Sequence, residues 1–535
     1  MLLIDRRGWR RKGRLDGTAA RQSAVAAAAA LVVTGASAQL IPEVGGTTTE
    51  AGRTYYLNGD LTIRETLTDN ARQVAGGQEW DLITEIEPSI RWGVRNRWAR
   101  LSISYSINAI VYARASDLND VQQTLSIGAG ASDTASFELI PDRLFLNVGG
   151  DISQRVADPF GQRPPSGNRT NENLEQVASY FVNPYLVGNL GPLAQYRLDV
   201  RHAASSEANS FEFNRWTNAV AASVFSAPGF RRLGWSVNGS RTIDYFDDGR
   251  RTDQAALTAG VSYLVVPELT VRASAGSDWN NFESENQQRY DRYGAGFDWR
   301  PNVRTSVSAF VEDRFFGTGY NVLARYNAGR STWTYTAVRD VSDARGSFIG
   351  VTGSAYDLFF QQFEAIEPYP LLREQLVLDF LSQNNIPRDA QVTSEFIYYS
   401  ASLREEHRFA VAYRATPRTT FTASAFLRDT SRIDEVSNAD DIFTDSDFVR
   451  ERGVLFTASH RLTPLSSAGL RLSETRTTGQ FDDQSTRQRE ASIRWSTRLN
   501  PSMTFSVVGR HTNFDSATDP YTENELEAVL NIRLF

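Results

Sequence analysis

The sequence predicts an all-β protein: a transmembrane antiparallel β-barrel of the outer-membrane type, with about 22 strands (roughly 18 to 24) and one long, partly helical loop insertion. Segments of about 10 residues in which polar and apolar side chains alternate recur along the chain, as expected of tilted membrane-spanning strands. The connections between them largely alternate between short and long. After residue 38 no apolar run approaches the roughly 18 residues that a membrane helix needs.

The composition excludes several classes of protein. The 535 residues include no cysteine, which rules out disulfides, a cysteine nucleophile, a lipoprotein anchor and the usual structural zinc site. The formal net charge is −7 and there is no basic patch, so nucleic acid is not an expected partner. We expect no cofactor and no metal site.

Residues 1–38 have the organisation of a secretory signal peptide. A basic segment precedes a short apolar run at 24–33, and Ala36-Ser37-Ala38 forms a cleavage motif. The apolar run is too short for a membrane anchor. We therefore predict cleavage near Ala38, a polar periplasmic tail at 39–52 and a barrel at 53–535. The expected location is the outer membrane of a Gram-negative bacterium, among lipid and lipopolysaccharide, after insertion by the barrel-assembly machinery.

Each strand is predicted from its alternation. Leu101, Ile103 and Tyr105, for example, face away from Ser102 and Ser104, because successive side chains of a strand point to opposite faces. The predicted strands are 53–69, 80–94, 98–112, 121–139, 143–154, 175–190, 194–204, 214–228, 233–244, 252–266, 268–279, 290–300, 304–315, 319–328, 331–341, 405–416, 419–430, 450–461, 466–477, 486–499, 502–513 and 522–535.

The connections give the orientation of the barrel. The short ones, many with proline, are expected to be periplasmic turns. The longer ones, rich in Asp, Asn, Ser and Gly, are expected to be extracellular loops. These longer connections include 155–174, 205–213, 280–289, 431–449 and 478–485.

Aromatic residues gather near the short turns. We predict that five tryptophans form a periplasmic girdle: Trp92, Trp98, Trp235, Trp299 and Trp495. The chain ends on Phe535, and a C-terminal aromatic on the last strand resembles the signal that the barrel-assembly machinery reads. Arg533, the third residue from the end, departs from that signal, where an aromatic or apolar residue is usual.

The connection at 342–404 is far longer than ordinary loops. Within it, 370–381 is expected to form a short helix with Leu372, Leu376 and Phe380 on one face. The insertion would fold into the lumen as a plug, cap the mouth as a lid, or dock a partner. An inward fold is favoured, because an apolar helix face needs cover.

The sequence contains no recognisable catalytic motif. His202, with Asp199 nearby, and His511, with Asp515 nearby, lie towards loop ends, where outer-membrane hydrolases place catalytic histidines. Neither is part of a metal-binding or nucleophile motif, so we predict surface or lumen histidines and no catalytic residues.

Two neighbouring turns carry a more specific pattern. The first reads Trp299-Arg300-Pro301, followed by Arg304-Thr305. The second reads Arg314-Phe315-Phe316-Gly317, followed by Tyr320. Over 290–345 the chain resembles the PEP-CTERM system-associated outer-membrane proteins, a family of barrels similar to porins that occurs in exopolysaccharide and exosortase gene neighbourhoods. This resemblance implies a link to exopolysaccharide or surface-protein export, with export components or the polysaccharide as partners, and it supplies no catalytic residues.

The function predicted from the sequence is therefore a porin-like component of such an export system. A general passive diffusion porin is the first alternative. A non-conducting structural or docking barrel and an outer-membrane hydrolase with a rim histidine are the others.

Overall fold

The computed structural model describes residues 48–50, 53–128, 135–163, 170–206, 213–227, 229–230, 232–246, 249–284, 286–342, 377, 401–433, 443, 446–481 and 483–535. The predicted signal peptide, most of the predicted tail, and Leu372, Leu376 and Phe380 lie outside these residues. Of the central part of the insertion, only Val377 is described, as a helical and fully buried residue.

The described chain is almost entirely strand. The strands are β1 (Thr48–Glu50), β2 (Arg53–Thr68), β3 (Asp81–Arg95), β4 (Ala99–Tyr112), β5 (Asp120–Gly128), β6 (Ala135–Ile140), β7 (Leu144–Val156), β8 (Leu174–Leu190), β9 (Ala194–Ser206), β10 (Phe213–Ser226), β11 (Leu233–Phe246), β12 (Arg251–Val266), β13 (Leu269–Asn280), β14 (Gln288–Asn302), β15 (Thr305–Arg314), β16 (Gly317–Ala328), β17 (Ser331–Ser342), β18 (Ser402–Thr416), β19 (Thr419–Arg432), β20 (Phe448–Arg461), β21 (Ser466–Thr478), β22 (Ser485–Asn500), β23 (Met503–Asp515) and β24 (Tyr521–Arg533). No helix among the described residues is long and apolar enough to cross a membrane.

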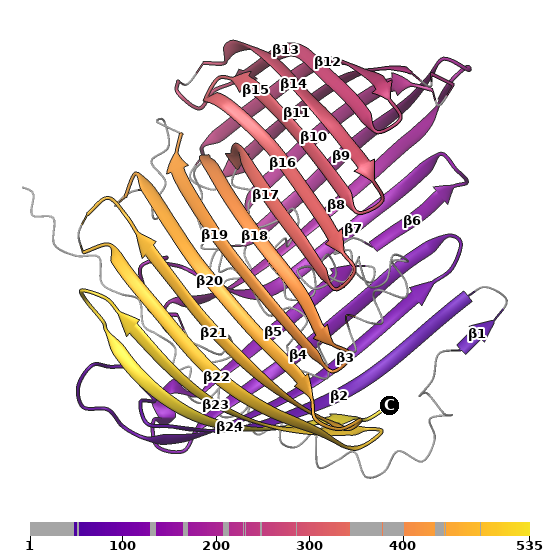
Figure 1. Ribbon diagram of the computed structural model, residues 1–535. Coiled ribbons are helices and arrows are strands. Elements are labelled where there is room, and N and C mark those ends of the chain that lie inside the picture. Colours follow the sequence, from indigo (N-terminus) through magenta and orange to yellow (C-terminus); the bar gives the residue numbers. More distant parts are fainter. Residues whose placement is uncertain are drawn as a thin grey trace, which may run out of the picture.

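The sheet closes on itself. From β7 onward each strand pairs antiparallel with the next in sequence, and β24 returns to pair with β2 in a register running from Asp60↔Arg533 to Thr68↔Glu525. The short β5 and β6 share one place in the wall between β4 and β7. The wall is therefore a closed antiparallel barrel of 22 strands, which confirms the predicted fold class (Figure 1).

One predicted strand is wrong in detail. The segment 121–139 was expected to be a single strand, but it forms β5 and β6 with an interruption after Gly128. The last described residue of β5 is Gly128. Glycine weakens a strand because it costs more backbone entropy and offers no side chain to pack.

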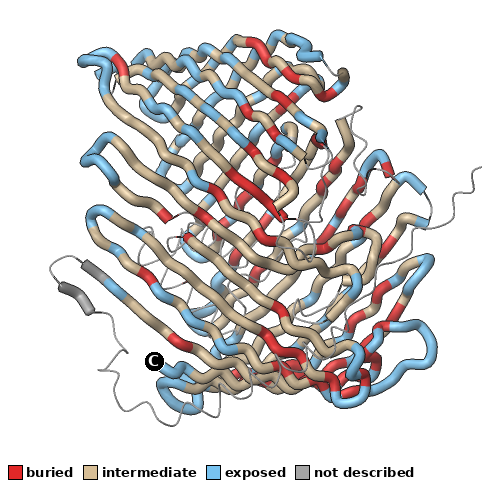
Figure 2. The backbone as a smooth tube through the Cα atoms, turned by 180° about the vertical axis from the view of Figure 1, so that it is seen from behind, coloured by how far each residue is buried: buried red, intermediate tan, exposed pale blue. Residues whose placement is uncertain are grey.

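The two faces of the wall differ as the alternation predicts. Outward positions carry exposed apolar side chains, such as Leu257, Val261 and Tyr263 on β12. Inward positions carry the polar and charged set described below. In Figure 2, the buried positions are densest on the side of the barrel away from the C-terminus. An apolar outer surface around a polar interior is the arrangement of a membrane barrel.

The predicted girdle tryptophans lie close to the short turns. Trp92, Trp235, Trp299 and Trp495 stand on the outward face near the turn ends of β3, β11, β14 and β22, and Trp98 directly precedes β4. All but Trp235 are more than two-fifths exposed. Their role as a membrane anchor remains a prediction.

The C-terminal Phe535 folds back onto β2. The backbone N–H of Gly59 donates to the Phe535 carbonyl at 3.1 Å, and the Leu534 N–H donates to the Gly59 carbonyl at 2.7 Å. The phenyl ring covers the Cα of Gly59, so that a side chain at residue 59 would meet the ring first. The end of the chain thus closes the seam between β24 and β2.

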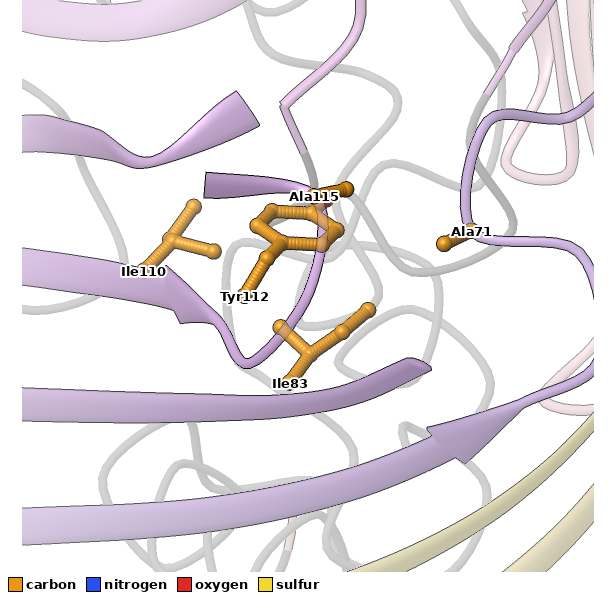
Figure 3. Close-up of a cluster of buried hydrophobic side chains, with 5 residues drawn as sticks. All are labelled: Ala71, Ile83, Ile110, Tyr112 and Ala115. Atoms are coloured by element: carbon orange, nitrogen blue, oxygen red, sulfur yellow. The ribbon is translucent and has the colours of Figure 1, made fainter. Parts of the chain in front are cut away.

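The loop ends of β2 to β4 carry a small apolar cluster on the inner side of the wall, formed by Ala71, Ile83, Ile110, Tyr112 and Ala115 (Figure 3). Buried Asp81 accepts the Ala115 backbone N–H at 2.8 Å, which holds the loop after β4 against the loop before β3. These loops therefore fold onto the wall.

An ion pair on the surface also ties these loops together. The Arg72 guanidinium donates two hydrogen bonds to the Asp117 carboxylate, each of 2.7 Å. These hydrogen bonds lower the pKa of Asp117 below its ordinary value.

Two strand glycines make a matched test of the packing. At Gly276, on β13, an added Cβ would come within 2.1 Å of the Leu257 carbonyl oxygen, whereas at Gly509, on β23, nothing lies within 4 Å. Because backbone cannot move aside cheaply, Gly276→Ala is expected to destabilise the barrel by about 1–3 kcal/mol. Gly509→Ala is expected to be neutral or slightly stabilising. Urea unfolding of the refolded variants measures both, and equal effects would contradict this packing.

Candidate functional site

The lumen is the candidate functional site, because its wall gathers most of the buried charge of the described chain. Inward side chains on neighbouring strands form three ion-pair networks, all in the half of the barrel nearer the long connections. Charges this close to one another and shielded from bulk water interact far more strongly than exposed surface pairs.

The first network lies where the barrel closes. Arg510 on β23 contacts three carboxylates, those of Glu525 at 2.6 Å and of Glu490 and Glu527 at 3.5 Å. Arg64 on β2 bridges Glu527 at 3.2 Å. Arg64 also contacts Glu85 on β3 at 2.5 Å. The two guanidiniums therefore link the inner faces of β22, β23, β24, β2 and β3.

The second network lies on β18 to β20. Glu406 accepts from Arg404 at 2.5 Å, from Arg408 at 2.9 Å and from Arg428 at 3.2 Å. Arg428 also contacts Glu451 at 3.2 Å, and both of these side chains are almost fully buried. Glu406 thus contacts three arginines on one patch of the wall, and Glu451 supplies a second carboxylate to one of them, Arg428.

The third network includes part of the motif noted in the sequence. Arg314 contacts Asp278 at 2.9 Å and Asp340 at 2.6 Å, while Arg292 contacts Asp278 at 3.1 Å and Glu312 at 2.5 Å. These pairs connect β13, β14, β15 and β17. Arg314, the arginine of the Arg-Phe-Phe-Gly motif, therefore links neighbouring strands of the barrel wall through ion pairs.

The other motif residues divide between turns and the outer face. Phe315 and Phe316 form a two-residue turn between β15 and β16, and Gly317 follows with a φ of +86°, which favours glycine. Their rings meet edge-on with centroids 5.1 Å apart. Tyr320 points outward, where its hydroxyl donates to Glu405 at 2.9 Å. Trp299, Arg300, Pro301, Arg304 and Thr305 lie at the turn between β14 and β15.

Aromatic rings and arginines alternate along the inner face of β7 to β9. The rings of Phe145 and Tyr185 stack with centroids 5.0 Å apart. Arg197 lies over the Tyr185 ring at 4.2 Å, and Arg201 lies over the Phe181 ring at 4.0 Å. We call these five residues the aromatic–arginine ladder. Such a surface offers flat apolar faces beside guanidinium groups that bind carboxylates and phosphates.

One loop crosses from the ladder side of the barrel to the opposite wall. The connection at 157–173 leaves between β7 and β8, yet Arg163 contacts Glu451 on β20 at 3.2 Å. The Arg163 carbonyl also accepts from Tyr521 on β24 at 3.1 Å, and Gln162 donates to the Gln73 carbonyl at 2.8 Å. We call the described residues of this connection, 157–163 and 170–173, the crossing loop. It brings Arg163 against the inner faces of β20 and β24.

The long connection expected at 155–174 is present between β7 and β8, and its described residues turn inward. Glu451 is fully buried, and it supplies the charge that draws Arg163 inward. The sequence shows a polar connection of ordinary appearance, and no local pattern reveals a partner almost 300 residues away. Only the closed strand order brings the two residues together.

The two histidines singled out in the sequence, His202 and His511, contact amide side chains in the structure. His202 contacts Asn218 at 2.9 Å on the outward face, whereas Asp199 pairs with Arg197 on the inward face. His511 contacts Asn524 at 2.8 Å. The structure thus separates His202 from Asp199, the nearby acid noted in the sequence.

Comparisons with solved structures find matches at low sequence identity. The siderophore receptor PirA from Pseudomonas aeruginosa is 7% identical, with a TM-score of 0.44 over 90% of this chain and 80% of the receptor. The ferric-catecholate import receptor Fiu from E. coli K12 is 9% identical, with a TM-score of 0.47 over 89% of this chain and 82% of the receptor. OccK2 (OpdF) from P. aeruginosa is 10% identical, with a TM-score of 0.33 over 89% of this chain and 98% of the OccK2 chain. No family model and no curated protein matches the chain.

Proposed function

We propose that this barrel is an outer-membrane channel that conducts acidic polysaccharide, as a porin-like component of an exopolysaccharide or surface-protein export system. The solute would travel through the lumen, along the aromatic–arginine ladder and past the crossing loop. No catalytic step is involved. The resemblance of 290–345 to the PEP-CTERM-associated barrels supports the link to export.

The ladder is the observation that carries this proposal. Sugar rings present apolar C–H faces that stack on aromatic rings, and the carboxylates of an acidic polysaccharide pair with guanidinium groups. The Tyr185 ring lies between Phe145 and Arg197. The Arg197 side chain pairs with Asp199 at 2.8 Å and is 44% exposed to the lumen, so a carboxylate of the polysaccharide would compete with Asp199 for it. A passive porin for small ions would need neither group in this arrangement.

Removing the aromatic ring of Tyr185 tests the proposal. Tyr185→Leu keeps an apolar side chain but removes the stacking face. In planar bilayers, block of the current by fragments of acidic polysaccharide is expected to become about 2- to 10-fold shorter-lived, since a lost aromatic contact is worth about 0.5–1.5 kcal/mol.

Tyr263→Leu is the matched control, because Tyr263 is an exposed tyrosine on the outer face of β12. It should leave the block unchanged. Equal block times for wild type and Tyr185→Leu would favour the passive porin, which has no polysaccharide site.

A further inference from the structure

A row of arginines crosses the outer face of the wall near the long connections. Arg452 on β20 pairs directly with Arg476 on β21, and Arg476 pairs directly with Arg487 on β22. Like charges placed directly opposite each other on a sheet destabilise it. Arg452 and Arg476 are both exposed, and neither has a carboxylate partner among the described residues. The described residues therefore leave room for an anion at this row.

The neighbouring acids compensate only part of this charge. Glu474 accepts from Arg487 at 2.7 Å and from Arg489 at 3.4 Å. Asp429 accepts from Arg450 at 2.6 Å. Asp515 lies 3.9 Å from Arg489. Among the described residues, the patch formed by Arg450, Arg452, Arg476, Arg487 and Arg489 thus keeps an excess of positive charge over these three carboxylates. Charge on the lipid face is tolerated near the membrane interface and not at its midplane.

An apolar depression of about 500 Å³ begins directly beside this row, on the outer face of β18 to β22. Val454 and Glu474 line it, each two residues from an arginine of the row and on the same face. Its floor and sides are mostly small or apolar residues: Phe409, Ala423, Ala425, Val454, Phe456 and Leu472.

Two aromatic pairs bound the depression. Phe409 packs against Trp333 with ring centroids 5.8 Å apart, and Phe456 stacks on Phe421 at 6.2 Å. Ala423 and Ala425 lie between these pairs on β19, so the wall is hollow there. Arg489 lines the depression as well as the charged patch, which joins the two into one surface.

We propose that this surface binds a phosphorylated, multiply acylated glycolipid of the outer leaflet. Its phosphates would pair with Arg452 and Arg476, and one acyl chain would occupy the depression. Arginine suits phosphate because its planar guanidinium donates two parallel hydrogen bonds. A free anion would satisfy the row but leave the depression unused. This inference concerns the outer face alone and holds whether or not the lumen conducts.

The test measures binding of diphosphorylated lipid A to the full-length mature protein, refolded in non-ionic detergent, by native mass spectrometry. The combined change Arg452→Gln and Arg476→Gln is expected to weaken binding roughly tenfold or more, since a hydrogen bond to a charged group contributes about 1.5–3 kcal/mol. Arg289→Gln is the matched control, because Arg289 is an exposed, outward-facing arginine on β14 that lies away from the depression. It should bind as wild type does.

Two further measurements separate the parts of the site. Ala425→Phe fills the depression and should weaken the binding of lipid A while leaving the arginines in place. Dephosphorylated lipid A should bind wild type more weakly than diphosphorylated lipid A does. This comparison uses no variant, so it tests the phosphate contact even if a variant folds poorly. Unchanged binding by the double variant, unchanged binding by Ala425→Phe, or full displacement of the lipid by inorganic phosphate would each overturn the proposal.

Discussion

Replacing Arg510 with glutamine is expected to destabilise the barrel by about 3–5 kcal/mol, the loss typical of breaking a buried ion pair from one side. The Arg510 side chain is 9% exposed and lies among Glu490, Glu525 and Glu527. Without its charge, the three carboxylates would repel one another across the inner faces of β22 and β24. The measurement is the free energy of unfolding in urea, from refolded protein in detergent or liposomes.

Two further variants show whether the loss of stability in Arg510→Gln comes from the ion-pair network. Arg300→Gln removes an exposed arginine from the turn between β14 and β15 and should change the free energy of unfolding by less than about 0.5 kcal/mol. Adding Glu525→Gln to Arg510→Gln removes the carboxylate nearest the lost charge and should recover part of the stability. An Arg510→Gln barrel as stable as wild type would contradict the described network.

Releasing the crossing loop is expected to raise the single-channel conductance severalfold. Arg163→Ala, Gln162→Ala and Tyr521→Phe together remove the three contacts described above: those to Glu451 on β20, to the Gln73 carbonyl, and from Tyr521 to the Arg163 carbonyl. Residues 162 and 163 would then be held less tightly to β20 and β24, which should widen the passage. Planar-bilayer recordings of wild type and variant give the comparison.

A change in conductance caused by releasing the loop must be distinguished from one caused by disturbing Glu451 in the wall. Arg428 also contacts Glu451, so Glu451→Gln would disturb the wall as well as the loop. The triple change at residues 162, 163 and 521 leaves the pair of Arg428 and Glu451 intact. If the triple variant conducts as wild type does, the loop does not constrict the passage.

The sequence predicts the wall well because strand alternation is a local signal. The β12 strand, expected at 252–266, spans Arg251–Val266, and its apolar residues face outward as predicted. The pairing of Arg510 with Glu525 follows from the register of two neighbouring strands. By contrast, the contact of Arg64 with Glu527 depends on closure of the barrel across 463 residues, and no local pattern specifies it.

The features missed by the sequence depend on similarly distant contacts. The crossing loop is drawn inward by Glu451, and the arginine row forms only once β20, β21 and β22 are in register. The alternation of side chains within β20 shows which face Arg452 occupies. It does not show that Arg476 lies opposite on β21. The motif at 314–317 stands out in sequence, yet its residues divide between the inner wall and a turn.

The most direct test of the central claim is the single-channel conductance of the mature protein, refolded from Gln39 onward, with and without acidic polysaccharide. Heat-modifiable gel mobility shows beforehand that the barrel is folded. The account predicts a steady conductance that the polysaccharide blocks reversibly. A folded barrel that conducts no current, or whose current is indifferent to the polysaccharide, would contradict it.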